Sequence, residues 1–208
     1  MRVLVVAPQS NLQNISDWVA AARGHELTVL NDSVSVREVL GCISGGGFQI
    51  VHFAGHGCTD ALEVSNGSIP EHLLEDAFRA AGTVELAILG ACSSVAIGAR
   101  LYMAGVPRVI SWRTDVDDHI AAVWAQAFYA SLQLSADVWD ATQTAGEAVR
   151  RLGAEPPIYL NGRMAVLENE IKTMRRTTKF GGAPIWVVVL LLAELVMTAG
   201  SILFVALR

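Results

Sequence analysis

Cysteine is scarce in this chain of 208 residues, occurring three times, at Cys42, Cys58 and Cys92. An odd count without regular spacing does not make the framework of a small disulfide-stabilised protein. Charge is also scarce, at 17% of residues, and the formal net charge is −5. Because a modestly negative chain offers no broad basic surface to a phosphate backbone, we expect no nucleic-acid partner. Pro8 interrupts the amino-terminal apolar run too early for a secretory signal peptide.

Apolar residues are abundant, at 52%, and they concentrate near the carboxyl end. The stretch 185–207 contains one ionisable side chain, Glu194. About 20 apolar residues suffice to cross a bilayer as a helix. The sequence therefore predicts a transmembrane helix over 184–207, preceded by a juxtamembrane helical connector over 163–183.

Flanking charge predicts the orientation of this helix. Positive residues favour the cytoplasmic side of a membrane. Four basic residues precede the span, and only Arg208 follows it. The four are Lys172, Arg175, Arg176 and Lys179. We therefore expect a single-pass protein of the inner (cytoplasmic) membrane, with its amino-terminal domain in the cytoplasm.

Glu194 is the unusual residue of the predicted span. A carboxyl group within a bilayer is costly unless it is protonated, paired or facing water, so such residues are candidates for function. Gly200 and its small neighbours provide a surface that suits contact between helices. One hypothesis is a homo-oligomer with Glu194 turned inward. The alternative is a neutral Glu194 that faces one partner helix and does nothing more.

The first 162 residues alternate between short apolar runs and amphipathic stretches. Strands are expected at 2–7, 25–30, 48–54, 84–91, 107–112 and 156–162. Helices are expected at 15–23, 32–47, 70–82, 93–105, 115–134 and 136–152. Because most of these strands are apolar rather than alternating, and because they alternate with helices, the pattern indicates a mostly parallel sheet covered on both faces. The predicted fold class is α/β, a three-layer sandwich with five to six strands in one domain over 1–162.

Sites in parallel sheets form at the carboxyl ends of the strands. The segment VHFAGHGCTD, at 51–60, lies at such an end and contains His52 and His56. On an extended strand these two residues lie roughly 13 Å apart. One zinc ion, with ligands about 2 Å away, would not reach both. We therefore expect no metal, and we expect His52 to pack or hydrogen bond inside the sheet.

Two other kinds of site are conceivable for the same segment. It lacks the glycine spacing of a dinucleotide fingerprint and the Lys-Ser/Thr pair of a P-loop, so no cofactor is expected. A cysteine–histidine pair fits better, because a reactive thiol needs a nearby base. The spacing from His56 to Cys92 matches a βαβ unit, which takes about 30 residues or more. Both side chains would then emerge at one edge of the sheet.

Five segments resemble, in order and spacing, the CHAT-type caspase-like peptidases of clan CD. They are FAGHG, LGACSS, GVPRVISWRTDVDD, FYASL and VWDATQTA, at 53–57, 89–94, 105–118, 128–132 and 138–145. The resemblance runs from Met1 to about residue 160. It implies a caspase-like sandwich, cysteine endopeptidase activity on protein substrates, and a dyad of His56 and Cys92. The backbone amides of Gly57 and Cys92 would then suit an oxyanion hole, since glycine permits close approach.

The resemblance also suggests substrate-binding residues after the fifth strand, at Trp112, Arg113 and Asp115. We expect Trp112 to pack along the cleft. Arg113 would read an acidic substrate side chain, whereas Asp115 would read a basic one, so the preference stays open. Asp117 and Asp118 fit better as residues of a helix amino-terminus.

Related domains act as partner-activated effectors in bacterial signalling or antiviral defence, so the resemblance implies an activating partner protein. Two rival interpretations remain. The caspase-like domain could be an idle scaffold that transmits a signal by binding. Alternatively, the span and Glu194 could disrupt a membrane while the soluble domain regulates assembly.

Overall fold

The structure is a computed structural model of the chain, and it describes residues 1–8, 19–31, 33–135 and 137–161. The chain separates into two units, Met1–Asn161 and Gly162–Arg208. The predicted connector, the predicted span, Glu194 and Gly200 lie outside the described residues. In the described ranges, no helix combines the length and the apolar character needed to cross a bilayer.

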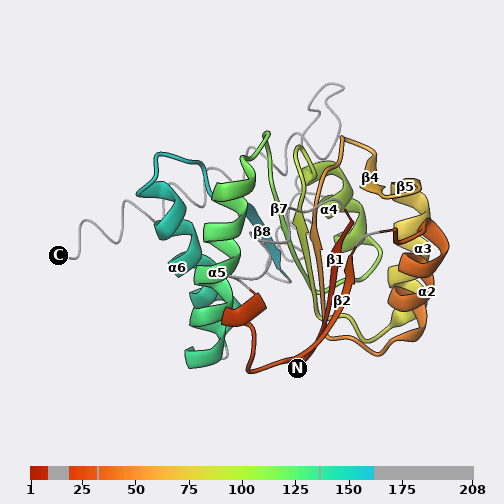
Figure 1. Cartoon of the computed structure of the whole chain (residues 1–208), viewed down its shortest axis with the longest axis horizontal. Helices are drawn as coiled ribbons and strands as arrows, with labels where there is room; N and C mark the ends of the chain where they lie inside the picture. The colour runs from red at the N-terminus through yellow and green to blue at the C-terminus, as the bar shows by residue number, and fades with distance from the viewer. Residues whose placement is uncertain (9–18, 32, 136, 162–208) are drawn as a thin grey trace, which may run out of the picture. The chain divides into compact units, whose positions relative to one another are not determined.

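The core of the first unit is a six-stranded sheet with the strand order β2-β1-β3-β6-β7-β8 (Figure 1). Its strands are β1 (Arg2–Ala7), β2 (Glu26–Asn31), β3 (Ile50–Ala54), β6 (Leu86–Gly90), β7 (Arg108–Ser111) and β8 (Ile158–Asn161). Four of the pairings are parallel, and only β7 with β8 is antiparallel. The prediction of a mostly parallel α/β sheet is confirmed.

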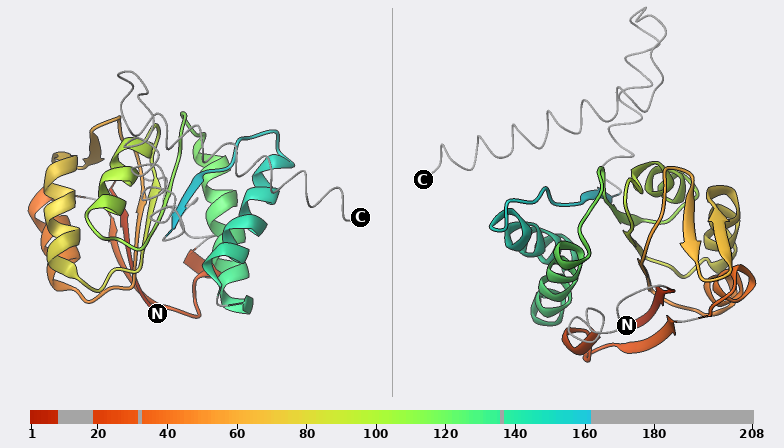
Figure 2. Two further views of the ribbon diagram at one scale, coloured as in Figure 1. Left: turned by 180° about the vertical axis from the view of Figure 1, so that it is seen from behind. Right: turned by 45° about the horizontal axis from the view of Figure 1, so that its top comes forward.

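Helices cover both faces of this sheet, as the front and rear views show (Figures 1 and 2). One face carries α2 (Val36–Gly45), α3 (Glu71–Ala81) and α4 (Val95–Met103), and the other carries α5 (Asp118–Ser135) and α6 (Val138–Arg150). Along β1, Leu4 and Val6 pack under the first layer, whereas Val3 and Val5 pack under the second. Because successive side chains of a strand point to opposite faces, a strand covered on both sides must be apolar throughout.

Local sequence signals fix the ends of the helices. Ser35 caps α2 in a capping box, in which its hydroxyl accepts from the amide of Glu38 and the Glu38 carboxylate accepts from the amide of Ser35. Gly82 ends α3 with a left-handed φ of 60°. The Asp117 carboxylate accepts from the His119 amide at 2.8 Å, which confirms the predicted role of Asp117 at the start of α5.

A hairpin between β3 and α3 was not predicted. Strands β4 (Ala61–Val64) and β5 (Gly67–Pro70) pair antiparallel and form a separate two-stranded sheet. Leu62, Val64 and Ile69 belong to the core beneath α2 and α3. The hairpin therefore extends the first helical layer and braces the loop that carries His56.

Candidate active site

His56 and Cys92 follow two neighbouring parallel strands at equal distances. Ala54 at the end of β3 pairs with Gly90 at the end of β6. The ladder continues one step further, because the Gly55 amide donates to the Gly90 carbonyl at 3.3 Å. His56 and Cys92 each come two residues after the paired Ala54 and Gly90. Both therefore leave the sheet at the edge where parallel α/β proteins form their sites.

Gly57 holds the histidine loop against the cysteine turn. A Cβ added at Gly57 would lie 3.1 Å from the Ala91 Cβ and 3.1 Å from the Ala61 carbonyl oxygen. The loop is also braced by the hairpin, because the Glu63 amide donates to the His56 carbonyl at 3.0 Å. Glycine at position 57 thus permits a close approach that a side chain would prevent. The residues directly before Cys92 and directly after His56 lie too close together for a side chain at position 57.

The cysteine turn is joined to the loop after β7 by a series of hydrogen bonds, which we call the turn–loop junction. The Ser94 hydroxyl accepts from the Trp112 amide at 3.1 Å, and the Ser93 amide donates to the Thr114 carbonyl at 3.2 Å. The Ser93 hydroxyl donates to the Asp115 carboxylate at 3.2 Å. This junction fixes the position of Cys92 relative to β7. Sequence analysis did not single out Ser93 or Ser94.

The Cys92 sulfur is itself part of this junction. The Val116 amide donates to Sγ at 3.4 Å, and Sγ lies 3.7 Å from the Val116 carbonyl oxygen that accepts from it. Within the described residues, no hydrogen bond joins Sγ to the His56 imidazole. Catalytic hydrogen bonds in unliganded proteins are often longer than in the complex with substrate. No feature of the sequence pointed to Val116, because its contribution comes from the backbone.

Ser93 adopts a left-handed backbone with a φ of 50°, which is uncommon for a residue with a side chain. Its amide and its hydroxyl are both engaged across the junction. Such conformations persist where surrounding contacts fix them, and they concentrate at functional sites. The strained residue follows Cys92 directly, so the backbone at the cysteine is set by the junction.

His52 is a core residue and takes no direct part in the site. It is buried, and its Nδ1 lies 3.1 Å from the Tyr129 hydroxyl in a hydrogen bond. Burial lowers the pKa of His52 to about 3, so its ring is neutral at physiological pH. Burial raises the pKa of Tyr129, which likewise stays neutral. The prediction that His52 packs and hydrogen bonds inside the sheet is confirmed.

Trp112 corrects one prediction. Its side chain is 4% exposed and belongs to the core cluster under α5 and α6, together with Ile110. We expected it to pack along the cleft. Its side chain instead lies on the same face of the sheet as that of Ile110, two residues earlier, so the ring packs into the core. Arg113 and Asp115 behave differently and are both exposed. Arg113 Nη1 lies 3.9 Å from the Glu155 carboxylate.

The other two cysteines have ordinary surroundings. Cys58 is exposed, and its thiol donates to the Asp60 carboxylate at 3.2 Å. Cys42 is half-buried on α2. All three cysteines are free. Across the part of the chain that the structure describes, no group of three or more His, Cys, Asp or Glu side chains is arranged to hold a metal ion.

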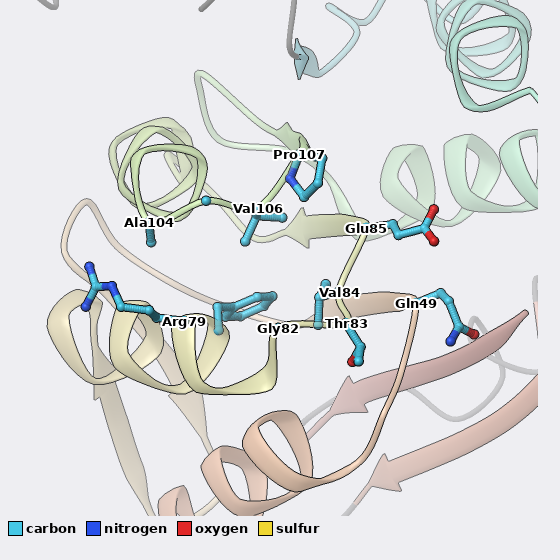
Figure 3. Close-up of a pocket in the computed structure, with 11 residues that line it drawn as sticks. Gln49, Arg79, Gly82, Thr83, Val84, Glu85, Ala104, Val106 and Pro107 are labelled. Atoms are coloured by element: carbon cyan, nitrogen blue, oxygen red, sulfur yellow. The ribbon is translucent and has the colours of Figure 1, made fainter.

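A pocket of about 420 Å³ lies at the opposite ends of the strands (Figure 3). Gln49, Glu85 and Pro107, which line it, come just before β3, β6 and β7. Arg79 of α3 forms another part of the wall, and the view shows it across the pocket from Glu85. The lining includes none of the residues predicted for catalysis or substrate binding.

Solved structures of proteases share this architecture. The Arg-specific cysteine proteinase gingipain R superposes with a TM-score of 0.58 at 11% identity, over 72% of this chain and 42% of that one. A structure described as a protease gives 0.52 at 12% identity, over 77% and 46%. The chain thus spans less than half the length of either. These likenesses show a caspase-like α/β fold of the kind found in cysteine proteinases.

The family follows from the sequence itself. The profile of the CHAT domain family matches residues 4–159. The chain therefore belongs to the CHAT domain family, as the resemblance in its motifs implied. No curated protein matches the chain. The matched range includes β3, β6 and β7 with the loops that follow them.

Proposed function

We propose that the chain is a cysteine endopeptidase in which Cys92 is the nucleophile and His56 transfers the proton. The observation that supports this most strongly is the pairing of Ala54 with Gly90, two residues before His56 and Cys92. The close approach of Gly57 to Ala91 adds to it. The cysteine-proteinase fold and membership of the CHAT family supply the chemical context.

The reaction follows from the chemistry of the two groups. The Cys92 sulfur attacks the carbonyl carbon of the scissile bond while its proton passes to the His56 imidazole. The carbon–nitrogen bond then breaks, and His56 returns the proton to the leaving amine. A thioester between Cys92 and the amino-side fragment remains. Water, deprotonated by His56, hydrolyses it and restores the thiol.

The backbone amides of Gly57 and Cys92 are the proposed oxyanion donors. Among the described residues, neither amide donates to a backbone carbonyl. At Gly57 the bonds of the hairpin are made by its neighbours, through the Cys58 amide and the His56 carbonyl. Two amides left open beside the nucleophile match what a tetrahedral intermediate requires.

Membrane attachment and activation by a partner belong to the same proposal. The predicted span at 184–207 would hold the peptidase near a cytoplasmic membrane surface, where anchored or recruited proteins would be its substrates. Detergent extraction of the full chain and of a chain ending at Asn161 tests the attachment. Recovery of both in the aqueous fraction contradicts it.

Mapping of new protein amino-termini in cells tests the peptidase directly. The full chain is co-expressed with the products of neighbouring genes, in parallel with Cys92→Ala and His56→Ala. We expect new termini with the wild-type chain and none with either variant. Cys58→Ala is the matched control, because it removes an exposed thiol two residues from His56. New termini that persist in Cys92→Ala, or none with the wild-type chain, contradict the proposal.

A further inference from the structure

Arg113 and Asp115 carry opposite charges in the loop after β7, and the sequence leaves open which of them contacts a substrate. Their side chains have different partners in the structure. Arg113 Nη1 lies 3.9 Å from Glu155 Oε1, a residue of the segment that leads into β8. The side chains are 39% and 58% exposed, so the pair is a surface one. The Arg113 charge is nevertheless already offset by a carboxylate.

The Asp115 carboxylate is tied to the cysteine turn instead. Its Oδ1 accepts from the Ser93 hydroxyl at 3.2 Å, and Ser93 is the residue after Cys92. The next residue along the loop, Val116, contacts the Cys92 sulfur through its amide at 3.4 Å. The carboxylate is therefore bonded to the residue that follows the nucleophile, and the residue that follows Asp115 contacts the nucleophile itself. Its position is set by the same contacts that set the thiol.

The acceptor capacity of Asp115 is largely unused. An ionised carboxylate offers about four acceptor positions, and Ser93 occupies one. Within the described part of the chain, no lysine, arginine or histidine forms an ion pair with Asp115. Asp117 and Asp118 add charge of the same sign nearby, but Asp117 is engaged as the cap of α5. Asp115 is thus an exposed carboxylate, oriented from one side and open on the other.

We infer that Asp115 selects substrates with a basic side chain, arginine or lysine, at the residue before the scissile bond. This rests on the proposed peptidase function and deepens it. A guanidinium or an ammonium group supplies the donors that the open side of the carboxylate lacks. An acidic side chain in the same place meets a charge of like sign, and Arg113 is already offset by Glu155. Opposite charges favour the basic substrate and like charges reject the acidic one.

Peptide acyloxymethyl ketones that differ at a single residue test this selectivity. The cysteine sulfur displaces their carboxylate leaving group and forms a stable thioether, which peptide mass spectrometry locates. Four probes carry arginine, lysine, aspartate or leucine before the ketone. They are applied in detergent to the full chain, purified after co-expression with the products of neighbouring genes, and the rate of Cys92 labelling is measured for each. We expect the arginine and lysine probes to label roughly tenfold faster than the aspartate probe.

Two charge-removing variants separate the role of Asp115 from a general effect. Asp115→Asn should slow the arginine and lysine probes roughly tenfold and leave the leucine probe unchanged. Asp117→Asn is the matched control, since it removes the same charge two residues away and asparagine also caps helices. It should change none of the four rates.

The outcomes distinguish the two proposals. Faster labelling by the aspartate probe, or equal rates in Asp115→Asn and wild type, overturns the basic preference while the nucleophile stands. A loss shared equally by all four probes in Asp115→Asn also overturns it, because the residue then supports the turn rather than the choice of substrate. If none of the probes labels Cys92, the peptidase itself is overturned, and this inference falls with it.

Discussion

Gly90 is the residue on which the approach of the two site-bearing strands depends most directly. A Cβ at this position would lie 2.7 Å from the Phe53 carbonyl oxygen and 3.4 Å from His52 Nε2. The Phe53 carbonyl is a backbone group and cannot rotate out of the way as a flexible side chain can. An added Cβ at position 90 would therefore push β3 and β6 apart. The same two strands place His56 and Cys92.

Gly90→Ala is therefore expected to destabilise the fold by about 1–3 kcal/mol through overpacking. It should also lower peptidase activity by shifting the two loops. Gly41→Ala is the matched control, because Gly41 is exposed within α2 and a Cβ there meets nothing within 4 Å. That change should stabilise by about 0.5–1 kcal/mol. Urea denaturation of both variants measures the difference, and an equal or reversed order contradicts this packing.

His52 makes stability depend on pH. Its pKa is about 3 in the folded protein against 6.5 as a model group, so below pH 6.5 the unfolded chain binds a proton that the folded one does not. The contribution of His52 to the free energy of unfolding is therefore fully present above about pH 6.5, and it is lost progressively as the pH falls towards 3. From pH 7 to pH 5 the loss due to His52 is about 2 kcal/mol.

Replacing both residues, as His52→Phe with Tyr129→Phe, removes this titration together with the hydrogen bond between the two side chains. Denaturation midpoints at pH 7 and pH 5 then measure how much the free energy of unfolding of each chain changes with pH. The wild-type chain should lose about 2 kcal/mol more than the double variant over this interval. His25, whose pKa burial also lowers, contributes to both chains and cancels in the comparison. An equal loss of stability in the wild-type chain and the double variant would show that His52 does not cause the pH dependence.

Trp112 shows what residue-scale prediction missed. Ile110 and Trp112 are two apart, and both belong to the cluster under α5 and α6. The strand alternation therefore continues one residue beyond the end of β7 at Ser111. Counting that alternation from Ile110 would have assigned the ring to the core. The motif drew attention to the neighbouring Arg113 and Asp115 instead.

At the scale of elements, α2 depends on its amino-terminal cap. Ser35 and Glu38 satisfy each other's amides, and hydrogen bonds to Ser35 hold the pKa of Glu38 below its usual range. Ser35→Ala should cost about 1 kcal/mol, because the first turn loses a side-chain acceptor. Ser44→Ala is the control, since the Ser44 hydroxyl donates to the Leu40 and Gly41 carbonyls of the same helix and caps neither of its ends. Urea midpoints compare the two, and an equal loss would argue against the cap.

The β4–β5 hairpin could have been predicted and was not. Its two-residue turn is Ser65 and Asn66, and Gly67, the first residue of β5, has a φ of 138°. An Asn-Gly pair between short runs with apolar residues at alternate positions is a local signal for a hairpin. The strands are only four residues long, however, and apolar content alone did not separate them from a polar loop. The direction of β8 was also beyond the local pattern, because strand direction depends on how the chain returns to the sheet.

At the scale of the whole molecule, the apolar strands and the helices between them were enough to predict the parallel sheet and its two helical layers. The edge that carries His56 and Cys92 followed from the same topology. The turn–loop junction did not, because several of its hydrogen bonds use backbone groups of Trp112, Thr114 and Val116, which no side-chain pattern marks. A sequence pattern shows where strands end, but it does not show which hydrogen bonds the backbone groups form in the loops that follow.

The central claim is that His56 and Cys92 act as one chemical pair. Alkylation of the full chain with iodoacetamide, followed residue by residue with mass spectrometry, tests it most directly. Cys58 is an internal reference, because it is exposed and lies in the same protein. We expect His56→Ala to slow alkylation of Cys92 by roughly tenfold, since the thiol loses its base, and to leave alkylation of Cys58 unchanged. A Cys92 rate that does not respond to His56→Ala would contradict the pair.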